Sequence, residues 1–346
     1  MMRIFMVFVL LPLMVFPVRG LDLTAPPVPD RGKELMPADT ASFGEGLGEM
    51  VRRCLEGLYP DWNEAVRTGT ALFLGAVALG TLGNLTGKEK RILDLAGAAA
   101  ASAMVLSGSD VLIRLAAGTI RDMNEYGKLL LPVMTASLAA QGGVTASAAL
   151  CAGTSLFGSL LGSLITEFLL PGVYLYLVMA VTWAATGEAA VKRLRDLIKS
   201  VISWCLKTLL TVFTTYMSIT GVVSGTTDAA VLKAAKVTIS SAVPVVGGIL
   251  SDASETVLVS AGLMKNSAGI YGIFACLSVF LGPFLGIAMH YWVLKVTAAL
   301  CGIVTEGAIS SLTEDFSAAM GLLLAMTASV CVLLLVSTVC FMKGVG

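Results

Sequence analysis

The chain has 346 residues, of which 56% are hydrophobic and only 13% are charged, and its mean hydropathy is +0.87. Soluble domains carry about 25% charged residues, so this composition excludes an ordinary soluble protein and indicates an all-α, polytopic helical membrane protein. The net charge of zero provides no electrostatic footprint for nucleic acid. The seven cysteines are scattered without a CxxC pair, so we expect them to be packing residues rather than disulfides or metal ligands.

Residues 1–20 have the pattern of a signal peptide. Arg3 precedes an apolar stretch, residues 4–16, that is short for a membrane span. Val18 and Gly20 are small enough for a cleavage site after Gly20. An uncleaved anchor helix is the alternative. The mature N-terminus is therefore predicted to be extracytoplasmic.

Residues 21–67 are predicted to form an extracytoplasmic head. The head begins with a proline-rich stretch. Apolar residues then recur at helical spacing up to Pro60, which predicts an amphipathic helix; they are Leu47, Met50, Val51, Cys54, Leu55 and Leu58. The helix either packs on the membrane domain or docks a partner.

Residues 68–346 are predicted to form the transmembrane domain, with about seven to nine helices. The first span, residues 71–85, is followed by the basic run KEKR, which marks a cytoplasmic loop. After a returning span at 92–106, residues 110–128 alternate apolar and charged side chains, which favours an interfacial helix. Three short spans are expected next, at residues 129–142, 146–166 and 169–185.

The second basic run, KRLRDLIK at residues 192–199, predicts another cytoplasmic segment. A span at 201–223 leads out again, and residues 270–304 are long enough for two short spans hinged at Gly282-Pro283. The acidic run TEGAISSLTEDF, residues 305–316, is expected outside. A last span at 320–342 then places Lys343 and the C-terminus inside.

A weak internal repeat relates residues 121–185 to residues 233–297. A shift of 112 positions places Pro132 on Pro244 and Pro171 on Pro283. Paired proline-interrupted segments are typical of transport folds with broken helices. Coincidence in a biased composition is the alternative.

The stretch from residue 240 to 269 is too polar for an easy span and predicts at least one broken or re-entrant segment. Pro244 removes a backbone donor, and Gly247 and Gly248 loosen any helix that follows. Backbone groups freed in this way cannot face lipid, so they are buried in protein or face water. The alternative is an amphipathic helix that lies on the outer surface.

Ionisable residues follow directly in the same stretch. Asp252 and Glu255 are three apart and therefore share a helix face, and Lys265 lies further along. We therefore predict that Pro244, Gly247, Gly248, Asp252, Glu255 and Lys265 line or gate a polar path.

Signals for catalysis are weak. Glu167, Lys207, His290 and Lys295 lie within apolar stretches, where charge is costly, although a position near a helix end also explains them. His290 is the only histidine, which excludes an HExxH site. Ser155 and His290 could be read as a serine–histidine dyad, but Gly-x-Ser is also a packing motif of membrane helices. We predict no enzyme, no catalytic residue, no cofactor and no metal.

The segment KAAKVTISSAVPVVGGILSDASETVLVSAGLMKNSAGIYG, residues 233–272, resembles the signature region of the stage III sporulation protein AE family. The runs LLLPVMTASLAAQGG, VKRLRDLIK and LLTVFTTYMSITG are similar to that family too. The resemblance extends over most of the chain from about Gly46 onward.

This resemblance implies a membrane-embedded subunit of a multiprotein channel or secretion-like complex in the mother-cell membrane around the forespore, where it supports forespore development. The implied partners are a cytoplasmic secretion-type ATPase, small membrane proteins, ring-forming proteins and membrane lipid. A stand-alone secondary transporter and a non-conducting scaffold that anchors other subunits are the alternatives.

Overall fold

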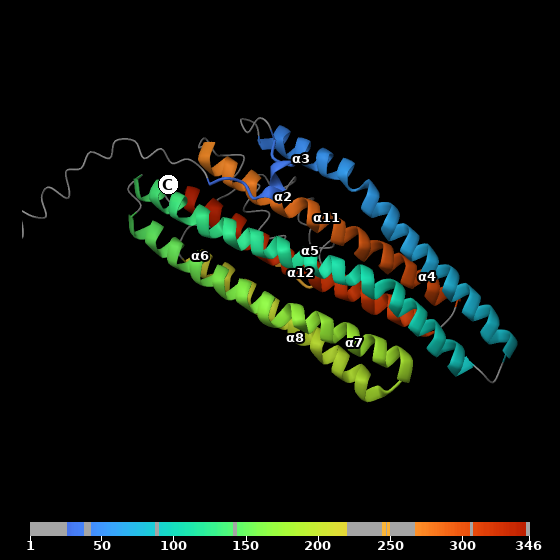
Figure 1. Cartoon of the computed structure of the whole chain (residues 1–346). Helices are drawn as coiled ribbons and strands as arrows, with labels where there is room; N and C mark the ends of the chain where they lie inside the picture. The colour runs from blue at the N-terminus through green and yellow to red at the C-terminus, as the bar shows by residue number, and fades with distance from the viewer. Residues whose placement is uncertain are drawn as a thin grey trace, which may run out of the picture.

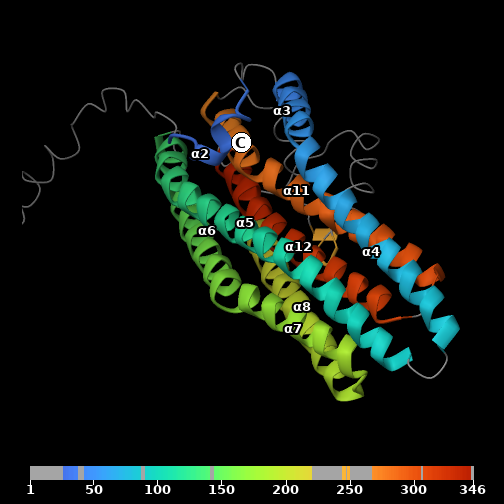
Figure 2. The same cartoon turned by 45° about the vertical axis from the view of Figure 1, so that its right-hand side comes forward.

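The structure is a computed structural model that describes residues 26–37, 43–86, 90–140, 144–219, 244–246, 248–249, 267–304 and 307–343. All regular structure in these residues is helical, and the long helices form an elongated bundle (Figures 1 and 2). The elements are α2 (Asp30–Lys33), α3 (Phe43–Gly57), α4 (Tyr59–Thr86), α5 (Lys90–Ala140), α6 (Val144–Leu164), the π-helix η1 (Ile165–Leu169), α7 (Leu170–Thr186), α8 (Ala189–Ile219), α11 (Ser267–Val304) and α12 (Ala308–Lys343).

Six stretches of the described residues are long and apolar enough to cross a membrane. This finding confirms the all-α polytopic class. Six is one fewer than the lowest number expected from the sequence, because continuous helices run through places where chain reversals or breaks were expected. The six stretches are Tyr59–Leu82, Leu95–Ala139, Ser147–Thr186, Ala189–Met217, Tyr271–Val304 and Ala308–Phe341.

Helix α5 is a single helix of 51 residues, where the sequence predicted a span, an interfacial helix and a second span. Most charged residues between 110 and 128 lie on one face: Arg114 and Arg121 are exposed, whereas Ile113 and Ile120 are buried in the core. The interfacial prediction for residues 110–128 is therefore wrong. A charged stripe on one side of a long helix gives the same alternation in the sequence.

The predicted spans at 146–166 and 169–185 are likewise one helical run, formed by α6, η1 and α7. Pro171 lacks an amide hydrogen, and its ring would collide with the carbonyl of residue 167 in a regular α-helix. The π-turn Ile165–Leu169 widens the coil directly ahead of this proline, so the chain bulges there without reversing. Pro283 also lies inside a continuous helix, α11, in place of the expected hinge between two spans.

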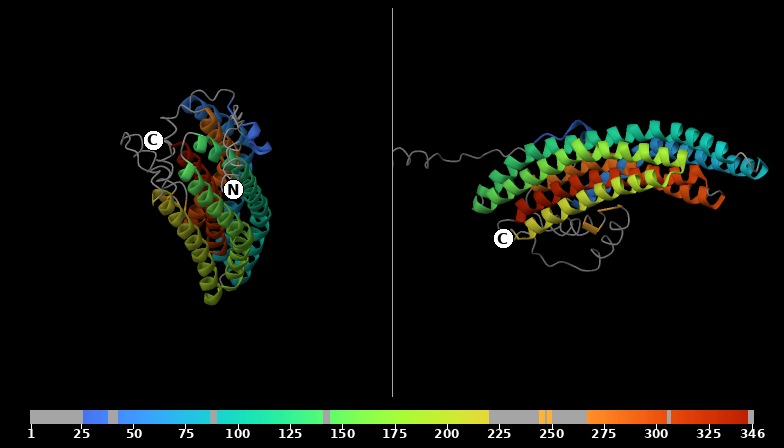
Figure 3. Two further views of the ribbon diagram at one scale, coloured as in Figure 1. Left: turned by 90° about the vertical axis from the view of Figure 1, so that its left-hand side faces the viewer. Right: turned by 90° about the horizontal axis from the view of Figure 1, so that it is seen from below.

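The bundle has two distinct ends. At the α7–α8 end, which contains Gly187, the start of α12 also lies close to α4 and α5: a Cβ on Gly97 would lie 3.4 Å from Ile309. At the C-terminal end, which contains Lys343, the start of α11 meets the ends of α5 and α12: a Cβ on Gly272 would lie 3.1 Å from Met134 and 3.6 Å from Thr338. Figure 3 shows the helices running between these ends from two further sides.

This arrangement corrects two predictions about which side of the membrane a segment occupies. The basic run 192–199 and the acidic run 305–316 were expected on opposite faces of a membrane, but Arg195 Nη1 lies 2.6 Å from Asp315 Oδ2. The head and the C-terminus were also expected on opposite faces. The start of α3 instead packs at the C-terminal end, where a Cβ on Gly46 would lie 2.6 Å from Phe274.

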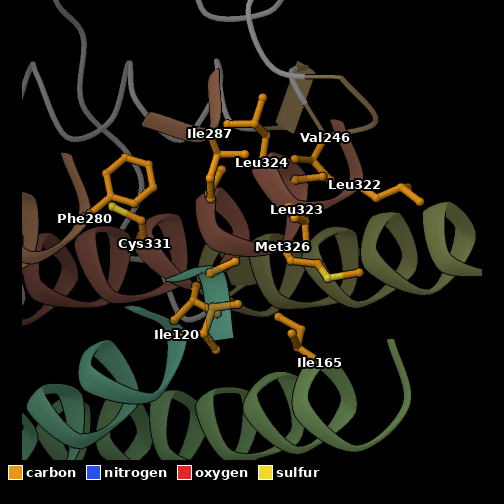
Figure 4. Packing of buried hydrophobic residues seen from close by; sticks show 14 of the residues in the cluster. Ile120, Ile165, Val246, Phe280, Ile287, Leu322, Leu323, Leu324, Met326 and Cys331 are labelled. Carbon is orange, nitrogen blue, oxygen red and sulfur yellow. The ribbon is translucent and has the colours of Figure 1, made fainter. Parts of the chain in front are cut away.

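Helix α12 is the centre of the bundle. Every residue from Ala319 to Phe341 is buried, and α12 contacts α4, α5, α6, α7, α8 and α11. Its hydroxyl groups are satisfied locally; for example, the hydroxyls of Thr327 and Ser329 donate to carbonyls of the preceding turn at 3.0 and 2.6 Å. Figure 4 shows Leu322, Leu323 and Met326 of this helix among side chains from its neighbours.

The described part of the head packs along α11 and α5. Met50 and Cys54 of α3 are buried, and Met50 packs with Phe274 of α11. Arg31 of α2 forms an ion pair of 2.7 Å with Asp122 of α5. Residues 59–67, expected in the head, belong to α4, because Pro60 occupies the first helical turn, where its missing N–H is tolerated. The predicted signal peptide lies outside the described residues.

Candidate functional site

The segment around Pro244 lies against the centre of the bundle. Pro244, Val245 and Val246 form a tight turn in which the Val246 N–H donates to the Pro244 carbonyl at 2.9 Å. Val245 has φ = 73°, as in a classic γ-turn, a conformation that strains a β-branched residue by about 1–3 kcal/mol. The packing of the side chains around the turn holds this strained backbone in place.

Gly321 of α12 provides the seat for this turn. A Cβ added at Gly321 would lie 2.9 Å from Cγ of Pro244 and 3.3 Å from Cε2 of Tyr291 on α11. Val246 is fully buried in the core cluster that contains Leu322 and Leu323, and Figure 4 shows it beside α12. The absence of a side chain at Gly321 therefore lets the proline ring approach the helix.

The seat lies far along the bundle from the ends of the two helices that flank this segment in the sequence. Gly321 lies 13 residues after Ala308, which is about 20 Å along α12 from the α7–α8 end, at about 1.5 Å per residue. Helix α8 ends and α11 begins at the other end of the bundle: Tyr216 near the end of α8 donates to the carbonyl of Ala149 early in α6 at 2.9 Å, and Gly272 lies beside Thr338. Pro244 thus lies beside the middle part of α12, whereas α8 ends and α11 begins at the C-terminal end of the bundle.

Of the six predicted gate residues, the structure describes two. Pro244 is half-buried on Gly321, and Gly248 is exposed. Gly247, Asp252, Glu255 and Lys265 lie outside the described residues, so their grouping stays a prediction.

A second polar feature is a cavity of about 740 Å³ between α5 and α6, which we call the α5–α6 groove. Charged and amide side chains of α5 form one wall, and small or hydroxyl residues of α6 form the other. The floor is α12. The lining residues include Arg121, Asn124, Glu125, Lys128 and Pro132 of α5, Thr154, Ser155, Gly158, Ser159, Gly162, Ser163 and Thr166 of α6, and Leu333 and Leu334 of α12.

Close contacts join α6 to α5 and to α12 along the groove. Gly162 makes room for the Asn124 side chain, since a Cβ there would lie 2.5 Å from Asn124 Nδ2. Thr154 donates to Ser337 of α12 at 3.0 Å. Pro132, predicted as the repeat partner of Pro244, lines this groove, which meets α12 at Leu333 and Leu334. Pro244 instead packs against Gly321 of α12. The two prolines therefore do not form one site.

A buried ionic network at the α7–α8 end was not expected from the sequence. Arg195 and Asp315 are about nine-tenths buried, and the Tyr176 hydroxyl donates to Asp315 Oδ1 at 2.9 Å. The Arg195 guanidinium also donates to Asp196 at 2.7 Å and lies 4.4 Å from the centre of the Trp183 ring. This network ties α7 and α8 to the start of α12.

The other polar residues singled out in the sequence are dispersed. His290 Nδ1 lies 3.0 Å from the Gly286 carbonyl of its own helix, whereas Ser155 lines the α5–α6 groove, so the structure does not bring this pair together as a dyad. Lys295 lies 3.7 Å from Glu314 at the bundle surface. Glu167 and Lys207 are exposed, and Glu167 lies in the π-turn.

Six candidate spans, a central helix enclosed by its neighbours and a turn inserted against it define a polytopic α-helical membrane protein. The chain belongs to the stage III sporulation protein AE family, which matches residues 76–344, so its role lies in sporulation. This match includes α12, the Pro244 turn and the α5–α6 groove.

A relative in Bacillus subtilis (strain 168), named stage III sporulation protein AE, is 26% identical over 197 residues. The alignment covers 57% of this chain and 49% of the relative, so the chain matches about half of that protein's length. No solved structure matches this chain.

Proposed function

We propose that this protein is the membrane-embedded subunit of a multiprotein channel or secretion-like complex, a multi-pass protein of the mother-cell membrane around the forespore. Its partners would be a cytoplasmic secretion-type ATPase, small membrane proteins and ring-forming proteins, and it would support forespore development without catalysing a reaction. Membership of a sporulation family supports this proposal.

The observation that carries the proposal is the seat of Pro244 on Gly321. A strained, non-helical turn against the central helix can move without breaking a membrane span, which is what a gate requires. Non-helical backbone within a membrane is tolerated only where protein or water shelters it from lipid. We therefore propose that the Pro244 turn is the movable element that gates the polar path predicted from the sequence.

The proposal also includes an orientation. Lys90 and Arg91 begin α5, and Lys192 and Arg193 lie near the start of α8, so basic residues gather at the α7–α8 end. By the positive-inside rule this end faces the mother-cell cytoplasm. The head then lies on the side of the forespore, as expected after a signal peptide.

Enlarging Gly321 tests the gate. We expect Gly321→Leu to displace Pro244 and to reduce spore yield by at least about tenfold, because overpacking of a close contact costs about 1–3 kcal/mol. The variant protein should still accumulate in the membrane. Gly108→Leu on α5 is the matched control, since nothing lies within 4 Å of a Cβ there. Normal sporulation of Gly321→Leu would count against a gate at this seat.

Co-purification tests membership of the complex. A tagged chain solubilised from sporulating cells is expected to recover the ATPase and the small membrane proteins in fixed ratios. If the tagged chain complements a deletion but is recovered alone after mild crosslinking, the complex is excluded.

The unpaired charges of the α5–α6 groove also suit a secondary transporter that acts alone. Ion-coupled uptake by the purified chain in vesicles, without partners, would favour that function. A non-conducting scaffold is favoured instead if Asp252→Ala and Glu255→Ala leave both sporulation and complex assembly intact.

A further inference from the structure

The α5–α6 groove contains ionisable groups of both signs within two turns of one helix. Arg121, Glu125 and Lys128 follow each other at helical spacings of four and three, so they lie on one face of α5. All three are exposed, and none forms an ion pair with another described residue. They belong to the candidate span Leu95–Ala139, where an uncompensated charge costs about 2.5–3.5 kcal/mol at the bilayer centre.

The outer end of the groove, where a Cβ on Gly127 would lie 2.6 Å from Leu334, is close to the level expected for lipid headgroups. Helix α12 has 36 residues and a length of about 54 Å, about 24 Å more than the hydrocarbon thickness of about 30 Å. A centred membrane therefore leaves about 12 Å of α12 beyond the hydrocarbon at each end. Leu334 on the groove floor precedes Lys343 by nine residues, or about 14 Å.

The opposite end of α12 agrees with this placement. Asp315, which pairs with Arg195, lies seven residues after Ala308, or about 10 Å from that end. Asp315 and Leu334 are 19 residues apart along α12, or about 28 Å, which is close to the hydrocarbon thickness of about 30 Å. The exposed Leu160 of α6 lies deeper than the level of Leu334, where acyl chains would meet the helix.

We propose that the α5–α6 groove binds a membrane phospholipid whose headgroup contains both a phosphate and a primary ammonium, the chemistry of phosphatidylethanolamine. Arg121 and Lys128 bind the phosphate through charge-assisted hydrogen bonds, and Glu125 accepts from the ammonium. Hydroxyls of α6, including those of Ser155 and Ser159, complete the polar wall. A volume of about 740 Å³ is large enough for the headgroup and the first part of its chains. This inference does not depend on membership of the channel complex.

Thermal unfolding of the purified full chain in detergent tests the site. Phosphatidylethanolamine is expected to raise the melting temperature more than phosphatidylglycerol, which has no ammonium, or phosphatidylcholine, whose trimethylammonium has no N–H to donate. Glycerophosphoethanolamine, which lacks acyl chains, should give no comparable shift, and an equal shift would assign the site to a soluble headgroup. Equal shifts with all three lipids would overturn the proposal.

Substitutions separate the roles of the three side chains. The double variant Arg121→Gln/Lys128→Gln is expected to bind phosphatidylethanolamine roughly tenfold more weakly, and Glu125→Gln to lose the preference over phosphatidylglycerol. Arg114→Gln is the matched control: the same change on the same helix, outside the groove and paired with Asp110. An unchanged affinity in the double variant would contradict the assignment.

A cysteine in the groove gives a second readout that does not depend on the stability of the charge variants. With Ser159→Cys in a chain without other cysteines, phosphatidylethanolamine is expected to slow labelling by a soluble maleimide. Unchanged labelling, or crosslinking of this cysteine to another protein in the native membrane, would show that lipid does not occupy the groove.

Discussion

Arg195 and Asp315 form a contact that constrains the arrangement of the chain, because they are separated by 120 positions and almost fully buried. Each alone would be a charge removed from water at a cost of several kcal/mol, and together with Tyr176 and Asp196 they satisfy one another. The network connects α7, α8 and α12 at one end of the bundle.

Breaking one partner of this pair should therefore be more harmful than removing both. We expect Arg195→Met to destabilise the protein by about 3–5 kcal/mol, whereas Arg195→Met with Asp315→Leu recovers part of that loss. Arg193→Met, an exposed neighbour on the same helix, should stay within about 0.5 kcal/mol of wild type. Unfolding of the detergent-solubilised protein measures all three, and equal losses for Arg193→Met and Arg195→Met would refute the role of the pair.

The residues of this network were visible in the sequence, but their contact was not. Arg195 belongs to a run counted as cytoplasmic and Asp315 to a run counted as external. Charge counting assigns each run to one side of the membrane separately. Only the packing of the two helical hairpins shows that the two runs meet. Pro244 was identified correctly as a break because proline acts on its own backbone, whereas its seat on Gly321 depends on a residue 77 positions away.

At the scale of elements, two prolines and one charged stripe account for most of the difference between the expected and observed helices. Pro283 suggested a hinge, a boundary was expected just before Pro171, and the charges of residues 110–128 suggested an interfacial helix, but long helices run through all three places. The lost hydrogen bond is local, and a π-turn or neighbouring helices compensate for it. Helical periodicity correctly predicted α3, since Met50 packs with Phe274 of α11 and Cys54 is buried.

The docking of α3 can be followed through Cys54. Burial raises the pKa of this thiol and covers its sulfur, so at neutral pH it is predominantly protonated and should react slowly with maleimide. Met50→Asp should undock α3 and accelerate labelling by more than about tenfold in a chain whose other cysteines are replaced. Leu55→Asp, a change on the exposed face of α3, should leave labelling slow. Fast labelling in the parent chain would contradict the packing of α3 on α11.

At the scale of the whole molecule, the helices pass back and forth so that the end of α8, the start of α11 and the end of α12 lie at one end of the bundle, and the α7–α8 connection and the junction of α11 with α12 lie at the other. The composition alone established the class of the protein, because it depends on the average residue. The side of each connection could not be predicted in the same way, since one extra reversal within a long apolar stretch inverts everything that follows.

Labelling from the two sides of the membrane tests this arrangement most directly. Single cysteines at Glu188, Glu314 and Glu45, all exposed, would be introduced into a chain without other cysteines and treated with an impermeant maleimide. The structure predicts that Glu188→Cys and Glu314→Cys react from one side and Glu45→Cys from the other. Reaction of Glu188→Cys and Glu314→Cys from opposite sides would contradict the bundle and the seat of Pro244 within it.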